Sequence, residues 1–442
     1  MKKCFAGLLA ALVLALAFAT PALAMEGYAP DFELGAAAAY VANIDTDLVV
    51  YEKSSDAPME AASLTKLMTM ILMLKTYQDQ LDTITVTAPG YIYDILYGTG
   101  ASTADIWRGE THTLRTLLYA MELPSGNEAA YIVADYMGGG SVDNFVAMMN
   151  AEAADIGCTA TLFTDPCGLD AGNTTTARDA YLLLRTAMGY DAFVQAAAAP
   201  QYEVPASSNH DAPYTILSTD KMISSASPYY RSYTQGGKTG SLNSGWQNFV
   251  SWHTQDGETY ISALMHSPTE ADPEGGRPAL VETAEIVDWA FSTFAVSPAL
   301  DTTQPISELP IAYSSQTDTV MLYPADDMMT LLPREGGAAL TEQTFHLPER
   351  LTAPVQQGDV VGNVTLSIQG EKVGTVDLIA GSTVERNQML YTMARVGEFF
   401  SSTYFKVLVI LIMIVIAIYA FFWVLSMLFT ASGTGSRTKK KR

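Results

Sequence analysis

The sequence has few basic residues for its length and no recognisable metal-binding pattern. It contains 24 Lys and Arg against 47 Asp and Glu, a formal net charge of -23, and eight of the basic residues lie at the two ends of the chain. Such an acidic surface repels nucleic acid, so no nucleic-acid partner is expected. The five histidines show neither His-x-His nor His-Glu-x-x-His spacing. A zinc peptidase is therefore not expected, and the sequence calls for no metal or other cofactor.

Cysteine is also scarce, with only Cys4, Cys158 and Cys167 in the chain. Cys4 falls in a segment that we expect to be removed. In an exported protein the other two could form a disulfide, or they could be two small buried side chains. Spacing alone does not show whether their Cα atoms come within reach, so both alternatives stay open.

Long uncharged apolar runs occur only near the two ends. Residues 1–24 contain two lysines, an apolar stretch and Ala22-Leu23-Ala24, which is the arrangement of a secretory signal peptide with a small-residue cleavage site. Residues 407–429 are apolar over roughly 23 positions, enough to cross a bilayer. The basic tail at 430–442 predicts a cytoplasmic C-terminus. The sequence thus predicts an exported protein, anchored in the cytoplasmic membrane by a C-terminal helix, with its domains on the extracytoplasmic side.

Two globular regions are expected between these ends. Residues 25–298 mix strand-like and helical runs, which indicates an α/β or α+β domain. Its strand-like runs lie far apart in sequence but could share one antiparallel sheet; they are 38–43, 48–51, 249–253 and 259–265. Residues 303–385 change to short alternating segments separated by Gly, Pro and Asp, which predicts a small all-β domain. Residues 386–405 would form a short stalk.

The stretch "AASLTKLMTM" places Ser63 three positions before Lys66, ahead of the apolar run 67–73. If a helix begins here, the two side chains lie one turn apart and the helix is buried nearly all round. A neutral lysine can activate the serine hydroxyl as a nucleophile. Lowering its pKa from about 10.4 to near 7 takes roughly 4–5 kcal/mol, which burial and a second cation can supply. The pattern alone is weak, because an N-cap serine with a solvated lysine fits it equally well.

Two further stretches strengthen this interpretation. "LPSGNEAA" puts Ser125 and Asn127 in a tight turn before a helical run, and "GGKTGSL" puts Lys238, Thr239 and Gly240 at the head of the strand-like 249–253 region. Separately these are an ordinary turn and an ordinary strand end. In the order Ser-x-x-Lys, Ser-x-Asn and Lys-Thr-Gly, they form the three-part signature of the penicillin-binding proteins and serine β-lactamases.

The sequence around these motifs resembles that of the low-molecular-mass penicillin-binding proteins, the serine-type D-alanyl-D-alanine carboxypeptidase family. The similar stretches include "GETHTLRTLLYAMELPSGNEAAYIVADYMGG" and "APVQQGDVVGNVTLSIQGEKVGTVDLIAG". The resemblance implies a penicillin-binding/β-lactamase-like catalytic domain followed by a small β domain. It implies peptidoglycan pentapeptide stems and β-lactams as partners, and hydrolytic removal of the terminal D-alanine as the reaction. Cys167 and Asn173 stand where many relatives have histidine. We expect these differences to affect substrate preference and rate.

The resemblance also implies the catalytic roles. Ser63 would attack the carbonyl of the penultimate D-alanine, and Lys66 would be the general base for that attack. Ser125 would pass the proton to the leaving D-alanine amine. Water would then hydrolyse the acyl-enzyme on Ser63.

The same resemblance implies the substrate-binding residues. Asn127 would orient the Lys66 amine or the substrate amide, and Lys238 and Thr239 would hold the terminal carboxylate. Gly240 would allow the substrate backbone to approach the strand edge closely. The backbone N–H of Ser241, with that of the nucleophile, would form the oxyanion hole, a contribution of about 3–4 kcal/mol per donor.

Two other functions stay open. A membrane-tethered serine β-lactamase would share the three motifs but would need to activate water quickly; the loop "FTDPCGLDAGN" contains no glutamate of the kind that class A enzymes use. A non-catalytic β-lactam sensor or wall-binding protein is the other alternative, although a sensor would be expected to carry a larger cytoplasmic part than the residues after 429. The oligomeric state is not predicted.

Overall fold

The computed structural model describes residues 23–24, 28–242, 244–268, 278–368 and 370–432. The chain divides into two compact units, the first of residues up to 297 with 329–340, the second of 298–328 with the residues from 341 onward. The segment 329–340, which the sequence placed in the β-rich region, thus groups with the first unit. The signal peptide at 1–24 lies outside the described residues except for Leu23 and Ala24, and it stays a prediction.

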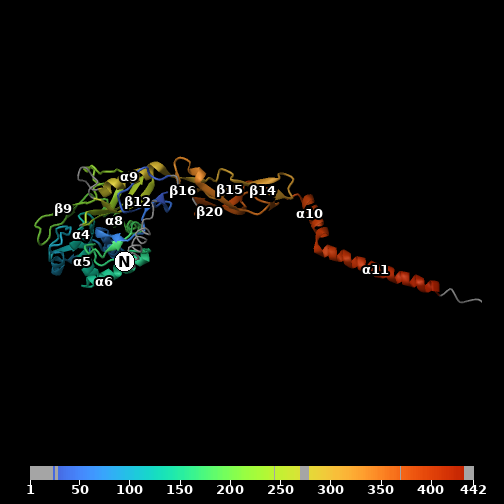
Figure 1. Cartoon of the computed structure of the whole chain (residues 1–442), viewed down its shortest axis with the longest axis horizontal. Helices are drawn as coiled ribbons and strands as arrows, with labels where there is room; N and C mark the ends of the chain where they lie inside the picture. The colour runs from blue at the N-terminus through green and yellow to red at the C-terminus, as the bar shows by residue number, and fades with distance from the viewer. Residues whose placement is uncertain (1–22, 25–27, 243, 269–277, 369, 433–442) are drawn as a thin grey trace, which may run out of the picture. The chain divides into compact units, whose positions relative to one another are not determined.

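The first unit is built on a six-stranded antiparallel sheet in the order β1-β3-β2-β12-β11-β10 (Figure 1). In β12, Tyr260 lies opposite Asn43 of β2 and Met265 lies opposite Ala38. The early and late strands therefore share one antiparallel sheet, as predicted. The strands are β1 (Leu23–Ala24), β2 (Ala38–Asn43), β3 (Leu48–Lys53), β10 (Thr234–Ser241), β11 (Trp246–Gln255) and β12 (Glu258–Pro268).

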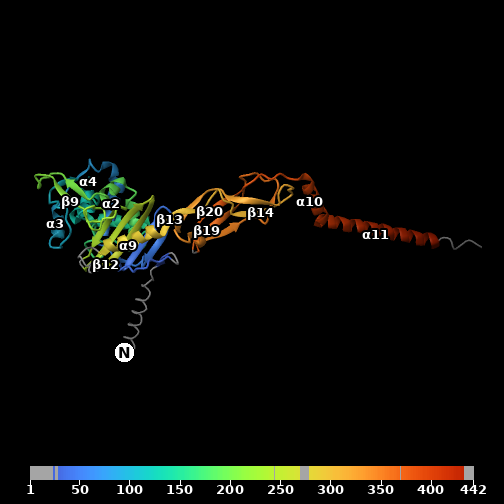
Figure 2. The ribbon, with the colours of Figure 1, turned by 90° about the horizontal axis from the view of Figure 1, so that it is seen from above.

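Helices cover both faces of this sheet (Figure 2). Side chains alternate between the faces of a strand, so neighbouring residues of β12 reach different layers. The Tyr260 ring packs edge-on against Phe291 of α9 (Pro278–Thr293), with ring centroids 5.0 Å apart. Its neighbour Ile261 belongs instead to the large core that contains α2 and α7. The sheet is therefore sandwiched between α9 and a layer of several helices.

Helix α2 (Lys66–Tyr77) is the centre of that helical layer, with every residue from Lys66 to Leu74 buried. Leu, Met and Ile occupy nearly all its faces, so it is stable only when other helices surround it. It packs against α4, α5, α6, α7 and α8. The helices are α3 (Gly90–Leu96), α4 (Leu114–Glu122), α5 (Asn127–Met137), α6 (Val142–Ile156), α7 (Ala177–Ala187) and α8 (Asp191–Ala197).

Short strand pairs tie the loops to this layer. Strand β4 (Met59–Glu60) pairs with β7 (Thr174–Thr175) immediately before the first motif. This pairing fixes where the chain enters the helix that carries Lys66. The other pairs are β5 (Thr85–Thr87) with β6 (Thr111–Thr113), β8 (Gln201–Val204) with β9 (Tyr214–Leu217), and β13 (Phe294–Leu300) with β16 (Met328–Pro333).

The second unit contains a six-stranded sheet in the order β17-β19-β20-β15-β14-β18. Strands β19 and β20 form a hairpin, with Ile368 opposite Glu371. The all-β prediction for this region is confirmed. The strands are β14 (Ser307–Ala312), β15 (Thr319–Pro324), β17 (Thr341–His346), β18 (Leu351–Thr352), β19 (Val360–Ile368) and β20 (Glu371–Ala380).

Two helices follow this sheet. Helix α10 (Gln388–Ser401) lies in the segment expected to be a stalk, and α11 (Thr403–Ser432) follows. Within Thr403–Leu428 of α11, an 18-residue window has a mean hydropathy of 3.1 and is not buried in the protein. At about 1.5 Å per residue, such a helix exceeds the hydrocarbon thickness of a bilayer. Its length and composition are therefore compatible with the expected membrane anchor.

Candidate active site

The Lys66 amine is where the first two motifs meet. Lys66 is fully buried, and its Nζ lies 2.9 Å from Ser63 Oγ, 2.6 Å from Asn127 Oδ1 and 2.9 Å from the Cys167 carbonyl oxygen. The two carbonyl oxygens can only accept hydrogen bonds. A neutral amine has two N–H donors for them and one lone pair, which then faces the Ser63 hydroxyl. The geometry therefore suits a lysine that accepts the serine proton.

The environment favours this neutral form. Burial is the largest influence and lowers the pKa of Lys66, while the surrounding acidic groups, including Asp165, Glu128 and Glu122, act in the opposite sense. Desolvation penalises a buried ammonium more than these carboxylates stabilise it, so the net shift is downward. Lys66 consequently loses its proton at a lower pH than a solvent-exposed lysine does.

The segment before Ser63 is held in an unusual conformation. Ala62 has a φ of 47°, which non-glycine residues rarely adopt, at the start of the 3₁₀ turn Ala62–Thr65. Hydrogen bonds on both sides hold this strain. The Ala61 N–H donates to the Asn173 carbonyl at 2.9 Å, and Asn248 Nδ2 donates to the carbonyls of Glu60 at 2.9 Å and Ala61 at 3.1 Å. The sequence analysis missed Asn248, although a polar residue within the apolar run "NFVSWH" was a usable signal.

The second and third motifs meet at another serine and lysine. Ser125 has a φ of 61°, and Lys238 Nζ lies 3.0 Å from its Oγ; both side chains are buried. Ser125 belongs to the turn before α5, as predicted. Thr239 is buried beside Lys238, and its hydroxyl bonds to that of Thr219 at 2.7 Å. The structure thus brings two serine–lysine pairs into one site.

The Lys-Thr-Gly motif lies on a different element from the one expected. It sits inside β10, an edge strand of the main sheet, and not at the head of β11. The packing gives a second reason for a glycine at position 240, apart from the close approach of the substrate. A Cβ there would lie 3.3 Å from the Ala61 carbonyl oxygen and 3.4 Å from the Ala62 Cβ. The missing side chain lets β10 pack closely against the segment that carries the nucleophile.

The loop 163–173 is organised by Asp165, which the sequence analysis also missed. Its Oδ1 accepts hydrogen bonds from the backbone N–H groups of Cys167 and Gly168, and its Oδ2 from those of Leu169 and Asp170, at 2.6–3.0 Å. Four charge-assisted bonds to one carboxylate fix the loop conformation. They also fix the Cys167 carbonyl that accepts from Lys66.

The two cysteines are free thiols, so the disulfide alternative is wrong. Cys167 is fully buried and Cys158 is partly buried. Burial raises the pKa of both thiols, that of Cys158 to about 12. Cys167 contributes its backbone carbonyl to the site, and its side chain belongs to the core.

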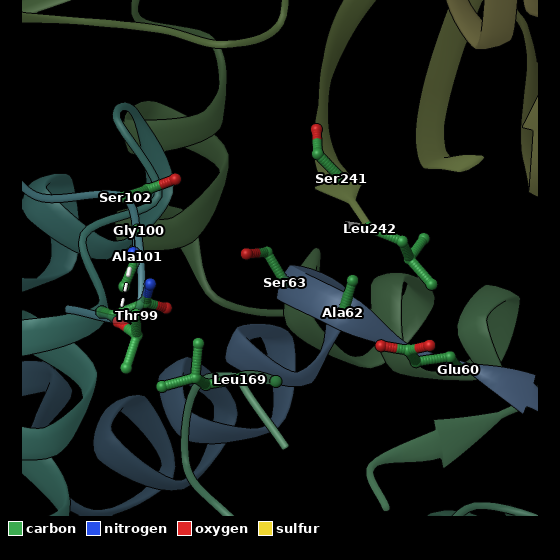
Figure 3. Close-up of a pocket in the computed structure, with 12 residues that line it drawn as sticks. Glu60, Ala62, Ser63, Thr99, Gly100, Ala101, Ser102, Leu169, Ser241 and Leu242 are labelled. Carbon is green, nitrogen blue, oxygen red and sulfur yellow. Dashed lines mark hydrogen bonds between the residues drawn. The ribbon is translucent and has the colours of Figure 1, made fainter. Parts of the chain in front are cut away.

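An open pocket gives access to the nucleophile. In Figure 3 the Ser63 hydroxyl points into the space between the loop 99–102 and Ser241 at the end of β10. The backbone N–H groups of these two serines are those that the sequence assigned to the oxyanion hole. The lining residues are Glu60, Ala62, Ser63, Thr99, Gly100, Ala101, Ser102, Asn127, Gly168, Leu169, Ser241 and Leu242.

The fold and this constellation define a serine enzyme of the penicillin-recognising class. Residues 24–269 match the family model described as D-alanyl-D-alanine carboxypeptidase, and residues 302–386 match the C-terminal domain of penicillin-binding protein 5. Because the first match spans more than half of the chain, the protein belongs to the D-alanyl-D-alanine carboxypeptidase family. The predicted family, fold class and serine-type carboxypeptidase activity are confirmed at this level.

Individual relatives agree with this assignment. The D-alanyl-D-alanine carboxypeptidase DacF of Bacillus subtilis is 23% identical over 374 residues, 84% of this chain and 92% of its own. DacB2 of Mycobacterium tuberculosis is 33% identical over 187 residues, 42% of this chain and 60% of its own. Among solved structures, penicillin-binding protein 5 from Haemophilus influenzae shares the fold at 22% identity, with a TM-score of 0.58 and coverage of 81% and 100%. The Streptomyces K15 DD-transpeptidase is 27% identical, with a TM-score of 0.54 and coverage of 60% and 99%.

Two glycines with positive φ allow a test of the loop that contacts Lys66. Gly168 has a φ of 80°, and a Cβ there would overlap the Ala62 carbonyl; Gly157 has a φ of 95° with nothing near its Cβ position. Both alanine variants should bear a similar strain of about 1 kcal/mol. Only Gly168→Ala should also displace the loop from the nucleophile segment, and it should slow acylation by fluorescent penicillin at least about tenfold. Equal acylation rates in Gly168→Ala and Gly157→Ala would contradict this view of the loop.

Proposed function

We propose that the protein removes the terminal D-alanine from peptidoglycan stem peptides through an acyl-enzyme on Ser63. The observation that carries this assignment of residues is the buried Lys66 amine, bonded to Ser63 Oγ and to two oxygens that can only accept. Membership of the family supports the reaction, and the geometry supports Lys66 as the base and Ser63 as the nucleophile.

In the first step Lys66 takes the Ser63 proton as the serine oxygen bonds to the carbonyl carbon of the penultimate D-alanine. The backbone N–H groups of Ser63 and Ser241 stabilise the oxyanion, at about 3–4 kcal/mol per donor. The proton then moves through Ser125 to the departing D-alanine amine as the C–N bond breaks. Lys66 is neutral again and can draw a proton from the water that hydrolyses the ester.

The substrate carboxylate is assigned to Lys238 and Thr239. Lys238 is a buried side chain on the edge strand β10, with its Nζ bonded to Ser125 Oγ. The outer edge of β10 lies beside the pocket through Ser241, so an extended peptide can run along it. Binding the terminal carboxylate at Lys238 puts the scissile carbonyl beside Ser63.

The β-lactamase alternative lacks a residue to activate water in the loop 163–173. The Asp165 carboxylate is occupied by four backbone N–H groups, and Asp170 Oδ1 accepts from the Gly172 N–H at 2.6 Å. These carboxylate oxygens are held by backbone N–H groups of the loop itself, so they orient the loop and are not directed at a water molecule. We therefore favour slow hydrolysis of a penicilloyl ester and useful turnover of the peptide substrate.

We also propose that α11 anchors the enzyme in the cytoplasmic membrane, with the catalytic unit on the extracytoplasmic side. The support is the apolar span Thr403–Leu428, which is uncharged after Lys406, the basic residues that follow it, and the signal-like segment 1–24. This location places the active site on the side of the membrane that holds peptidoglycan.

The reaction and the nucleophile can be tested together. The purified protein should release D-alanine from a D-Ala-D-Ala pentapeptide, as read by mass spectrometry, and should be labelled by fluorescent penicillin at Ser63. Ser63→Ala should reduce both to below about one thousandth, because no other hydroxyl of the described residues is hydrogen-bonded to Lys66 Nζ. The exposed Ser225→Ala should retain both. Penicillin labelling without D-alanine release at any pH would replace the proposed function with a sensor or wall-binding role.

The lowered pKa of Lys66 sets the pH dependence of acylation. The active form is the neutral amine, so the rate of penicillin acylation should rise with pH through the pKa of Lys66. Because burial lowers that pKa from 10.5, the midpoint should fall clearly below this value. Stopped-flow acylation across the pH range measures it, with near-UV circular dichroism to confirm folding. A midpoint at or above 10.5 would show that Lys66 is not the neutral base.

The membrane topology has its own test. Protease added to intact cells should digest the part from residue 25 to 403 and spare a tag fused after Arg442, because the bilayer covers α11 and the tail. Immunoblotting of the two parts gives the readout, and permeabilised cells are the control in which the tag is digested as well. A tag lost from intact cells would reverse the orientation.

A further inference from the structure

Glu122 is a buried acid that the mechanism above does not use. It is the last residue of α4 and is 3% exposed. Its segment "LLYAMEL" is otherwise apolar, and Glu122 Oε2 has no hydrogen-bond partner among the residues that the structure describes. An unpaired buried carboxylate oxygen is costly, so an acid at this position lowers stability unless it serves another purpose.

Two hydrogen bonds connect the end of α4, where Glu122 lies, to the active site. The Leu123 carbonyl, one residue on, accepts from the Thr219 N–H at 2.9 Å, and the Thr219 hydroxyl bonds to that of Thr239 at 2.7 Å. The end of α4, the loop that carries Asp220 and the strand that carries Lys238 therefore converge. Asp220 is also buried, with its Oδ1 accepting from the Met222 N–H at 2.8 Å.

The charges that act on Glu122 come from the three elements around it. They are Lys238 of β10, Asp220 of the loop 218–222 and Lys66 of α2. Burial is the largest influence and, with Asp220, raises the pKa of Glu122 to about 7, against the two lysines. Two neighbouring buried carboxyl groups do not readily ionise together, so one of them keeps a proton.

The charges balance if Lys66 is neutral. Among Glu122 and the groups that act on it, there are then one ammonium, on Lys238, and two carboxyl groups with one proton between them. We propose that Glu122 and Asp220 form an acid pair that holds one proton and supplies the single negative charge that balances the Lys238 ammonium. Both are positioning residues, since they act on the substrate carboxylate through Lys238. This inference rests on the proposed function of Lys238 as the carboxylate-binding residue.

The pair makes substrate binding depend on pH. Below about pH 7 it carries one negative charge, and above that pH Glu122 ionises and the charge doubles. The second charge repels the substrate carboxylate and offsets part of the attraction of Lys238. In Glu122→Gln only Asp220 can ionise, so the charge stays at one across the range.

The kinetic test compares KM for a D-Ala-D-Ala pentapeptide at pH 6 and pH 9, using the full chain in detergent. Glu122→Gln should match the wild type within about twofold at pH 6 and have a KM about tenfold lower than the wild type at pH 9. Glu203→Gln, the same change at an exposed position of β8, should follow the wild type at both pH values. A loss of kcat/KM that is equal at both pH values, or no difference at either, would overturn the proposal.

A double variant tests whether the two acids act as a pair. Asp220→Asn keeps an acceptor for the Met222 N–H and leaves Glu122 to ionise in its place, so its KM at pH 6 should change by about twofold or less. Glu122→Gln with Asp220→Asn leaves a buried ammonium without this counter-charge, which favours loss of its proton. Its KM at pH 6 should rise at least about tenfold, more than the product of the single effects. A merely multiplicative effect would contradict a shared role.

An infrared measurement separates this inference from the proposed reaction. At pH 6 the infrared difference between the wild type and Glu122→Gln should contain the carbonyl stretch of a buried protonated carboxyl group. The buried Glu128, whose pKa burial also raises, contributes to both spectra and cancels in this difference. The difference between the wild type and Glu203→Gln should lack the stretch. This signal does not require turnover. Its absence from the Glu122→Gln difference would refute the acid pair, whereas its presence in a protein that releases no D-alanine would refute only the proposed reaction.

Discussion

The burial of one amine determines how the rest of the catalytic unit is built. A lysine on a solvent-exposed helix stays charged near neutrality and cannot take a proton from serine. Lys66 lies at the start of a helix with other helices packed around it, and its hydrogen-bond partners are a side-chain amide, a carbonyl and the nucleophile. The apolar layer around α2 therefore has a chemical role as well as a structural one, because it provides the desolvation that lowers the pKa of Lys66 and favours the neutral amine.

The nucleophile depends on a second constraint, which is the placement of its backbone. The positive φ of Ala62 is held by Asn248 from the main sheet and by Asn173 from the loop 163–173. That loop is in turn fixed by Asp165. Sheet, loop and helix thus meet at one short turn, and each supplies a different part of the site. In the proposed mechanism, the sheet supplies the lysine for the substrate carboxylate, the helix supplies the base, and the loop supplies the acceptor that orients the base.

The roles of residues that stand in recognisable sequence motifs were predictable. The roles of residues that act through tertiary contacts were not. Ser63, Lys66, Ser125, Asn127 and Lys238 stand in three short motifs whose chemistry restricts what they can do. The strand patterns likewise predicted β2, β3, β11 and β12 of the first sheet and the all-β character of the second. Asp165 and Asn248 bind backbone groups that only the folded chain brings near them, so spacing gave no indication of their role. The position of the third motif was misassigned because Gly-Gly-Lys-Thr-Gly has little strand character, whereas pairing with β11 makes it a strand.

Gly168 and Gly240 lie in different segments of the chain and both face Ala62, which Gly168 approaches more closely. The turn that carries the nucleophile is therefore enclosed by positions that have no room for a larger side chain, which leaves little scope for sequence drift there. The other walls of the pocket are formed by the loop 99–102, Leu169 and Leu242. The size of side chains in these walls is not restricted by the turn. Evolutionary divergence in substrate choice among enzymes built on this plan should accumulate in those walls, while the turn itself stays nearly invariant.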